Sequence, residues 1–128
     1  MAINVKIKNF TKNELSCKCA CKTYNMDEEF LIRLQAFRYI LNMPMTITSA
    51  GRCKKHNMAV GGVDTSCHQC ETKKATAVDF TCKDLQKAYE VARRTELFNE
   101  IIWYQGKKFI HLGLDRNQNG FYCEKKVW

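Results

Sequence analysis

The stretch that decides the fold runs from Thr48 to Phe80 and reads TSAGRCKKHNMAVGGVDTSCHQCETKKATAVDF. It is completed by FIHLGL at residues 109–114. Together the two segments contain His68, Asp79 and His111. Two neutral imidazoles and one carboxylate fill three positions of a tetrahedral zinc ion and leave the fourth for a water, whose pKa the metal lowers to about 7. These residue types therefore indicate a catalytic zinc site and a hydrolytic reaction.

The order of the surrounding residues carries more information than the spacing of these three. The residues concerned are Ser49, Arg52, Asn57, Gly61, Gly62, Ser66, His68, Ala77, Asp79 and His111. In this order the chain resembles the zinc D-alanyl-D-alanine carboxypeptidases and the related phage L-alanyl-D-glutamate endopeptidases. Their pattern is a Ser-Gly-Tyr-Arg-like turn, then Asn, Val-Gly-Gly, Ser-x-His, Ala-x-Asp and an aromatic-x-His on a strand. The resemblance extends from Phe10 to Leu114.

The resemblance implies a fold and a role for each matching residue. The fold is a single α+β domain over residues 1–128, in which helices pack on a small antiparallel sheet, similar to the hedgehog-type fold of the DD-peptidases. His68, Asp79 and His111 would be the zinc ligands, and Ser66 would hydrogen-bond the substrate. Arg52 would point into the cleft, where a guanidinium binds a substrate carboxylate or stabilises an oxyanion. The family usually has Gly-Tyr before this arginine, but here Ala50 and Gly51 precede it, so one aromatic contact is missing.

The segment between two of the expected ligands is longer than in the relatives. There the carboxylate usually follows the first histidine by seven positions, whereas Asp79 follows His68 by eleven. Ala77 to Phe80 reads as the start of a strand, so the added residues are expected in the loop between Gln69 and Ala75. The three ligands can then still converge.

At the position of the general base, the chain departs from the family pattern. Many relatives carry an acidic residue three positions before the last histidine, where this chain has Lys108, or at the end of the preceding strand, where it has Tyr104. A tyrosine with its ordinary pKa near 10 is a poor base at neutral pH. Glu100 lies on the same face of that strand but about 13 Å from position 104. The carboxylates left as candidates are Glu100, Asp115 and Glu71, and a protein that binds without cleaving is the other interpretation.

Eight cysteines are many for a chain of this size. Without a secretion signal they indicate reduced thiols, metal ligands or buried small residues, although a phage particle later meets an oxidising medium that permits disulfides. Cys17 and Cys21 alternate with Cys19 and so share one face of an extended segment. Cys67 and Cys70 flank His68 at the Cys-x-x-Cys spacing of half a structural zinc site. We therefore consider a second metal site or disulfides formed by Cys17, Cys21, Cys67 and Cys70, with Cys19, Cys53 or Cys82 as further partners.

Hydrophobic periodicity and turn residues predict the order of helices and strands. A single helical turn is expected at Thr11, a helix capped by Asn25 and ended at residues 42–44, and a second long helix capped by Thr81 and running to Arg94. A short helix is expected at residues 53–60. The expected strands are residues 3–8, 45–49, the segment beginning at Ala77, 100–104, 108–114 and 121–127. Within 108–114, His111 alternates with Ile110 and Leu112 and should face the opposite way.

Composition limits the remaining classes of protein. A chain of 128 residues can bury a core as one domain, and it contains no apolar stretch of the ~18 residues that suggest a membrane span. Twenty-one Lys and Arg against thirteen Asp and Glu give a net charge of +8, which favours anionic cell-wall polymers or nucleic acid as surroundings. The basic residues are scattered, and no nucleic-acid-binding motif is present, which argues against nucleic acid. The polar start without a signal peptide favours the host cytoplasm.

The sequence thus predicts a zinc peptidase that acts on the stem peptides of peptidoglycan. Its short length is typical of a phage product, either an endolysin released with the help of a holin or a lysin carried in the virion beside other virion proteins. The first alternative is a phage structural or wall-binding protein that keeps the fold but not turnover. The second is a small cysteine-rich zinc module that contacts nucleic acid.

Overall fold

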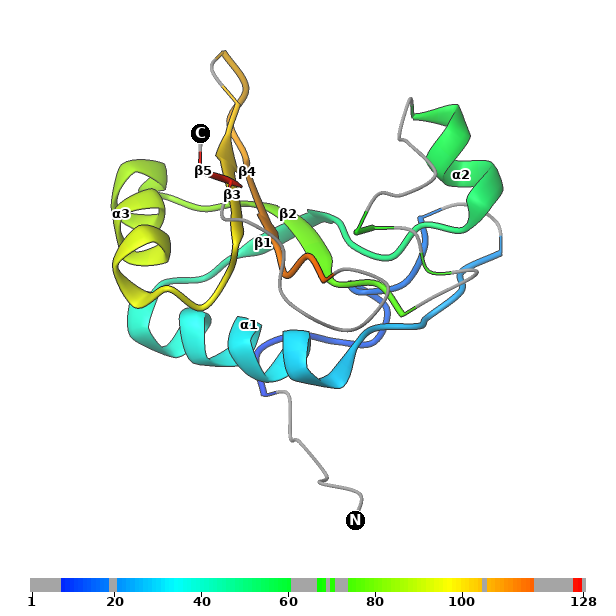
Figure 1. Ribbon diagram of the computed structural model, residues 1–128, viewed down its shortest axis with the longest axis horizontal. Helices are drawn as coiled ribbons and strands as arrows, with labels where there is room; N and C mark the ends of the chain where they lie inside the picture. Colours follow the sequence, from blue (N-terminus) through cyan, green and yellow to red (C-terminus); the bar gives the residue numbers. More distant parts are fainter. Residues whose placement is uncertain are drawn as a thin grey trace.

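The computed structural model describes residues 8–18, 21–60, 67–68, 70, 74–104, 106–116 and 126–127, except the side chains of 54–56 and 126. Helices and strands are interspersed along the chain, as Figure 1 shows. They are α1 (Glu28–Leu41), β1 (Thr46–Ser49), α2 (Lys54–Ala59), β2 (Ala77–Thr81), α3 (Leu85–Thr95), β3 (Glu100–Trp103), β4 (Ile110–Gly113) and β5 (Lys126–Val127).

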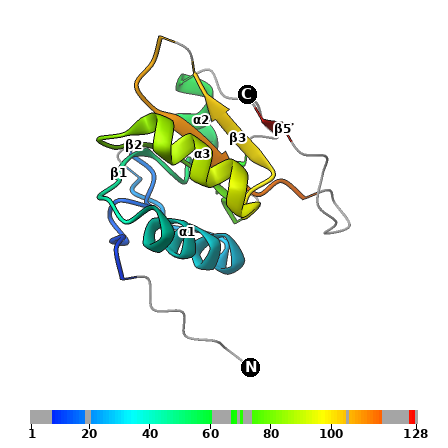
Figure 2. The same ribbon diagram turned by 90° about the vertical axis from the view of Figure 1, so that its left-hand side faces the viewer.

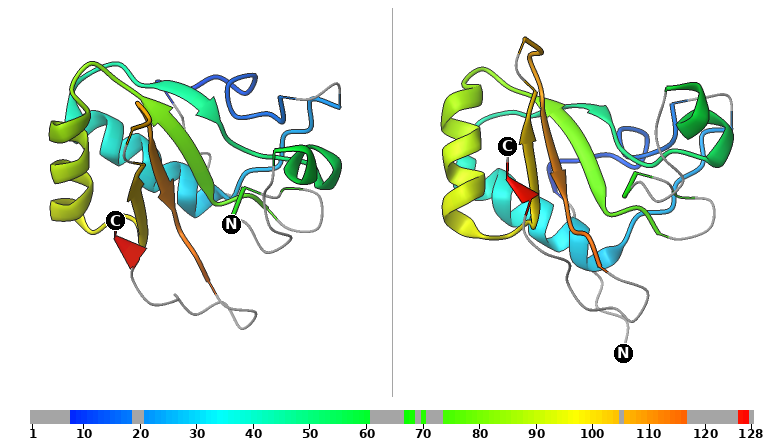
Figure 3. Two further views of the ribbon diagram at one scale, coloured as in Figure 1. Left: turned by 90° about the horizontal axis from the view of Figure 1, so that it is seen from above. Right: turned by 45° about the horizontal axis from the view of Figure 1, so that its top comes forward.

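The sheet has the order β1-β2-β4-β3-β5. Its first four strands are antiparallel, and the short β5 runs parallel to β3. Helices α1 and α3 lie side by side against the sheet (Figure 2). Helix α2 lies at the opposite end of the molecule from α3 (Figure 3). The predicted α+β class is therefore confirmed, with helices packed on a small and mainly antiparallel sheet.

One face of the sheet forms the core. Its fully buried side chains are Val78, Phe80, Ile101, Ile110 and Leu112. Phe37 of α1 packs edge-on against Phe80, with 5.9 Å between the ring centroids, and Tyr89 of α3 contacts Trp103 of β3. Side chains alternate between the two faces of a strand. Residues 79, 100 and 111 therefore lie on the face turned away from α1, and polar groups occupy all three positions.

Helix α1 is the helix predicted from the stripe of Phe30, Leu34, Phe37 and Leu41, all of them buried. The predicted N-cap Asn25 is wrong. Asp27 caps the helix, because its side chain accepts a hydrogen bond from the N–H of Phe30 at 2.9 Å. The amide of Asn25 instead donates to the carbonyl of Cys70. The helix ends at Leu41, where Asn42 adopts the left-handed conformation.

The start of α3 is also corrected. Thr81 does not cap it, because this residue ends β2 and pairs with Thr46 of β1. Asp84 is the N-cap, and its carboxylate accepts from the N–H of Lys87 at 3.1 Å. The turn predicted at Thr11 is present, and Glu14 bonds back to it as in a capping box.

The remaining element boundaries differ by a few residues from the prediction. Strands β3 and β4 are shorter than expected, and α2 covers residues 54–59 of the predicted 53–60. The predicted strand at 3–8 lies outside the described residues except for Lys8, and 126–127 are the described part of the predicted last strand. None of the described helices has the length and apolar character that a membrane span requires.

We predict that Asp27→Ala lowers the free energy of unfolding by about 1–2 kcal/mol, because it removes the N-cap of α1. The same carboxylate also binds Arg116, with an Nη2 to Oδ2 distance of 2.9 Å. Asp27→Asn should cost less, since an amide oxygen still accepts from Phe30 N. Urea denaturation measures both variants. The exposed Glu28→Ala is the control, and a loss as large in that variant would contradict the role of Asp27.

Candidate metal centre

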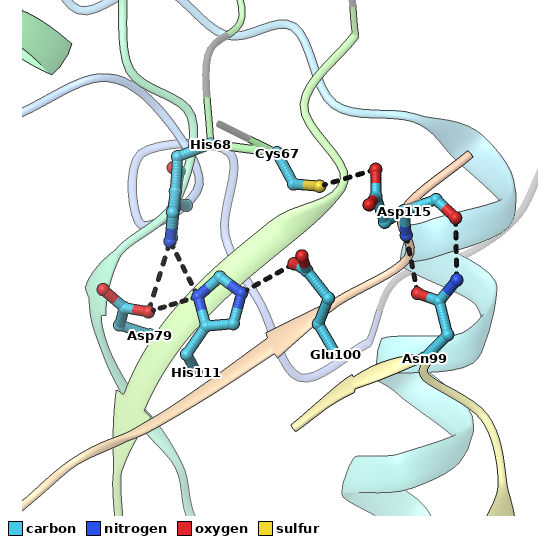
Figure 4. Close-up of polar contacts among 8 residues, drawn as sticks. Cys67, His68, Asp79, Asn99, Glu100, His111 and Asp115 are labelled. Carbon is cyan, nitrogen blue, oxygen red and sulfur yellow. Dashed lines mark hydrogen bonds and ion pairs between the residues drawn. The ribbon is translucent and has the colours of Figure 1, made fainter. Parts of the chain in front are cut away.

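Two of the three expected ligands are placed by the register of the sheet. Asp79 in β2 lies directly opposite His111 in β4. Opposite residues in an antiparallel pair point to the same face, with Cβ atoms about 5 Å apart. His68 comes from the loop before β2, where its carbonyl accepts from the N–H of Arg52 at 2.6 Å. The fold thus brings together three side chains that lie far apart in the sequence (Figure 4).

The three polar atoms form a nearly equilateral triangle. Nε2 of His68 lies 3.2 Å from Oδ1 of Asp79 and 3.2 Å from Nδ1 of His111. Nδ1 of His111 lies 3.0 Å from the same Oδ1. In a tetrahedron with zinc bonds of about 2.0–2.1 Å, two ligand atoms are separated by about 3.3 Å. The donor types and their mutual distances therefore fit zinc.

Each imidazole is held by a partner on its other nitrogen. Nδ1 of His68 lies 2.7 Å from the carbonyl oxygen of Ala50, which can only accept, so this nitrogen donates and Nε2 keeps its lone pair. Nε2 of His111 donates to Oε1 of Glu100 at 2.9 Å, which leaves Nδ1 as the atom facing the triangle. Such outer partners fix the tautomer and the ring orientation of histidines that bind metals.

The buried charges shift the pKa values of all three residues. Burial opposes protonation of His111, but the hydrogen bonds with Asp79 and Glu100 outweigh it and raise its pKa to about 9. Burial lowers the pKa of His68. The pKa of Asp79 lies well below its usual range, because its bonds with His111 and His68 outweigh the opposing effect of burial. Asp79 is therefore ionised at neutral pH, as metal binding requires.

Glu100 reaches the site across the sheet, not along its own strand. It pairs with Gly113 of β4, two residues after His111. A Cβ on Gly113 would collide with Oε1 of Glu100 and would lie 3.1 Å from Nε2 of His111. The missing side chain at 113 leaves the space through which Glu100 contacts His111. The glycine at 113 is visible in the sequence. Its relation to Glu100 can be inferred only when the pairing of β3 with β4 is known.

Arg52 lies beside the same cluster. Its Nε is buried and has no hydrogen-bond partner among the described residues. Burial lowers the pKa of its guanidinium, and the negative charge of Asp79 opposes this effect. Burial together with Asp79 and Glu100 raises the pKa of Tyr104, so the phenol stays protonated at neutral pH and is not available to accept a proton. Ser66 and Glu71, which the sequence also named, lie outside the described residues.

A second polar group adjoins the metal centre beyond Glu100. Ligand atoms of Cys67, Glu100 and Asp115 lie within 4.8 Å of one another. The thiol of Cys67 donates to Oδ1 of Asp115 at 3.6 Å, and Asn99 holds the backbone of Asp115 through two hydrogen bonds of 2.7 Å (Figure 4). The sulfur of Cys67 thus points to Asp115, and in the described part of the chain no sulfur joins the histidine triangle.

Cys17 and Cys21 lie together, as their alternation along the chain predicts, with Cys53 as the further partner. All three sulfurs lie within 4.8 Å of one another. Cys67 contacts Asp115, and Cys70 belongs to the hydrophobic core. Chain spacing suggested a joint Cys67 and Cys70 site, but the loop turns the two side chains into different surroundings.

Comparison with known proteins places the chain in a family. The sequence model described as Peptidase M15 matches residues 8–113. No curated protein matches the chain.

We predict that His111 of the metal-free protein titrates at about pH 9. Its pKa is raised above the unfolded value of 6.5, so its stabilising effect is complete below pH 6.5 and is lost as the pH rises through about 9. Glu100→Gln should lower the pKa, because the amide carries no charge. NMR titration of chelator-treated protein measures it, with the exposed Glu90→Gln as control. A pKa near 6.5 in wild type would contradict the geometry.

We also predict that Gly113→Ala weakens zinc binding about 10- to 100-fold, the usual effect of losing an outer partner of a metal-bound histidine. The new Cβ would displace the carboxylate of Glu100. Zinc competition followed at the imidazole resonances measures the effect. Gly106→Ala is the matched control, because its φ of +78° strains any side chain but nothing lies within 4 Å of the added atom. That variant should lose stability and keep its zinc affinity.

Proposed function

The chain belongs to the Peptidase M15 family, and from this premise we propose that it is a zinc-dependent peptidase which cleaves peptide bonds in the stem peptides of peptidoglycan. The observation that carries the proposal is the triangle of His68, Asp79 and His111. It combines the expected ligand types with the distances that tetrahedral zinc needs. The same residues were singled out by the order of motifs in the sequence.

The proposed chemistry divides between the metal and the chain. When bound by His68, Asp79 and His111, zinc supplies Lewis acidity that polarises a carbonyl and lowers the pKa of a water. Nε of Arg52 is buried and has no hydrogen-bond partner among the described residues. The negative charge of Asp79 acts on the guanidinium and favours its charged form. A guanidinium in this position suits either a substrate carboxylate or the oxygen that becomes negative during attack.

Glu100 is best placed to orient His111. Its carboxylate accepts from Nε2, the nitrogen that points away from the ligand triangle. This bond holds Nδ1 in place and makes the imidazole a stronger donor towards a metal. We therefore assign Glu100 as a positioning residue. Because Oε1 accepts from His111, a role as proton acceptor would fall to the other carboxylate oxygen, Oε2.

The biological setting is a further part of the proposal. The net charge of +8 favours adsorption to anionic wall polymers. We propose a phage lysin that acts on the wall after holin-type release or as part of a virion, where other virion proteins would be its partners. A wall-binding protein without turnover is the second candidate, because Lys108 and Tyr104 stand where relatives usually carry acidic residues.

We predict that the wild-type protein releases new muropeptides from purified cell walls and that His68→Ala does not. Removal of a ligand from the triangle should abolish zinc binding at this site and the reaction together. Mass spectrometry of the products also identifies the bond that is cut. Circular dichroism must show that the variant is folded. Zinc-loaded wild type that leaves the muropeptides unchanged would favour the wall-binding candidate.

We predict that Arg52→Ala lowers kcat/KM about 10²- to 10³-fold, as loss of one oxyanion donor does. Arg52→Lys should keep a kcat/KM between those of wild type and Arg52→Ala, because a lysine lacks the planar fork of donors. The exposed Arg94→Ala is the matched control for charge and should keep full activity. A drop in kcat alone indicates stabilisation of the transition state, and a rise in KM alone indicates binding of the substrate carboxylate. Full activity of Arg52→Ala would exclude both roles.

A further inference from the structure

We infer that Cys17, Cys21 and Cys53 supply three of the four ligands of a second zinc site, structural in role and separate from the histidine centre. Their sulfurs all lie within 4.8 Å of one another. Two thiolates on one tetrahedral zinc are separated by about 3.8 Å, because each zinc–sulfur bond is about 2.3 Å long. Small rotations of the side chains therefore suffice to bring three sulfurs onto one ion.

The backbone around this thiol cluster already supports bound sulfur. The N–H of Cys53 donates to Sγ of Cys17 at 3.3 Å, and the hydroxyl of Thr23 donates to Sγ of Cys21 at 3.3 Å. Cys17 and Cys21 lie in one loop, which is closed by a hydrogen bond of 2.7 Å from Cys17 N to the carbonyl of Thr23. Lys22 within that loop has a φ of +48°. Hydrogen bonds donated to sulfur favour the thiolate, which is the form that binds a metal.

The thiol cluster lies apart from the main hydrophobic core. Cys17 and Cys53 are 2% and 6% exposed, yet neither belongs to the hydrophobic core cluster, whereas Cys70 does. Cys21 is exposed and would give an ion access from solvent. Soft thiolate ligands in tetrahedral geometry select zinc over magnesium or calcium. Cys19, between two of the three cysteines, lies outside the described residues.

The position of the thiol cluster explains what a second ion would do. Cys53 directly follows Arg52, whose N–H donates to the carbonyl of His68 and whose carbonyl accepts from Cys70 N at 2.8 Å. An ion on the thiol cluster would tie the loop at residues 17–23 to this segment. It would thereby hold in place both the guanidinium and one histidine of the metal centre without contacting substrate.

Native mass spectrometry of zinc-loaded protein, purified under reducing conditions, tests the inference through stoichiometry. We expect Cys21→Ser to bind one zinc ion fewer than wild type, His68→Ala one fewer, and the double variant two fewer. Cys21 is exposed, so its substitution leaves the core intact and far-UV circular dichroism should be unchanged. Cys82→Ser is the matched control and should keep the wild-type number. A Cys21→Ser protein that binds as much zinc as wild type would overturn the site.

Thiol alkylation gives a second readout that does not depend on a variant. We expect added zinc to slow labelling of the exposed Cys21 at least tenfold. Labelling of Cys82, which belongs to none of the candidate metal groups found among the described residues, should not change. Equal labelling of Cys21 with and without zinc would contradict the inference. So would a disulfide between any two of Cys17, Cys21 and Cys53 in the protein as isolated from cells, because a disulfide removes the thiolates. Neither result would affect the peptidase proposal, which rests on other residues.

Discussion

The register between β2 and β4 is the constraint on which the site depends. Val78 and Phe80 face the core from β2, as Ile110 and Leu112 do from β4. A slip of one residue would turn these apolar side chains to the polar face and move Asp79 away from His111. Burial of four large side chains therefore fixes the pairing. The ligand distances follow from hydrophobic packing on the other side of the same sheet.

Alternation and helical periodicity are local properties, and they could be predicted from the sequence. Helical periodicity predicts the buried face of α1. Alternation along the strand predicts that His111 faces away from the core. The caps could not be predicted as safely, because several residues near each helix start can accept a hydrogen bond. Tertiary contacts decide between the candidates. Asn25 donates a hydrogen bond to Cys70, and Asp27 caps α1. Thr81 pairs with β1 as part of β2, and Asp84 caps α3.

The contacts that the sequence did not predict all cross between segments. The distance along β3 made Glu100 look too far from the expected position of a base, but the relevant neighbour is on β4, opposite Gly113. Similarly, the spacing of Cys67 and Cys70 indicated a joint metal site, but Cys67 contacts Asp115 and Cys70 belongs to the hydrophobic core. A sequence pattern reports neighbours along the chain, whereas these contacts depend on which strands and loops lie side by side.

The charges of the site give a reason why it favours a cation. The carboxylates of Asp79 and Glu100 lie together on a largely buried face, and buried negative charge is costly unless a positive group accompanies it. Without metal, a proton on His111 fills that role, and Arg52 adds a second positive charge nearby. A divalent ion that replaces the proton leaves the cluster with an excess of positive charge. Such a site suits a group that carries a carboxylate or develops a negative oxygen.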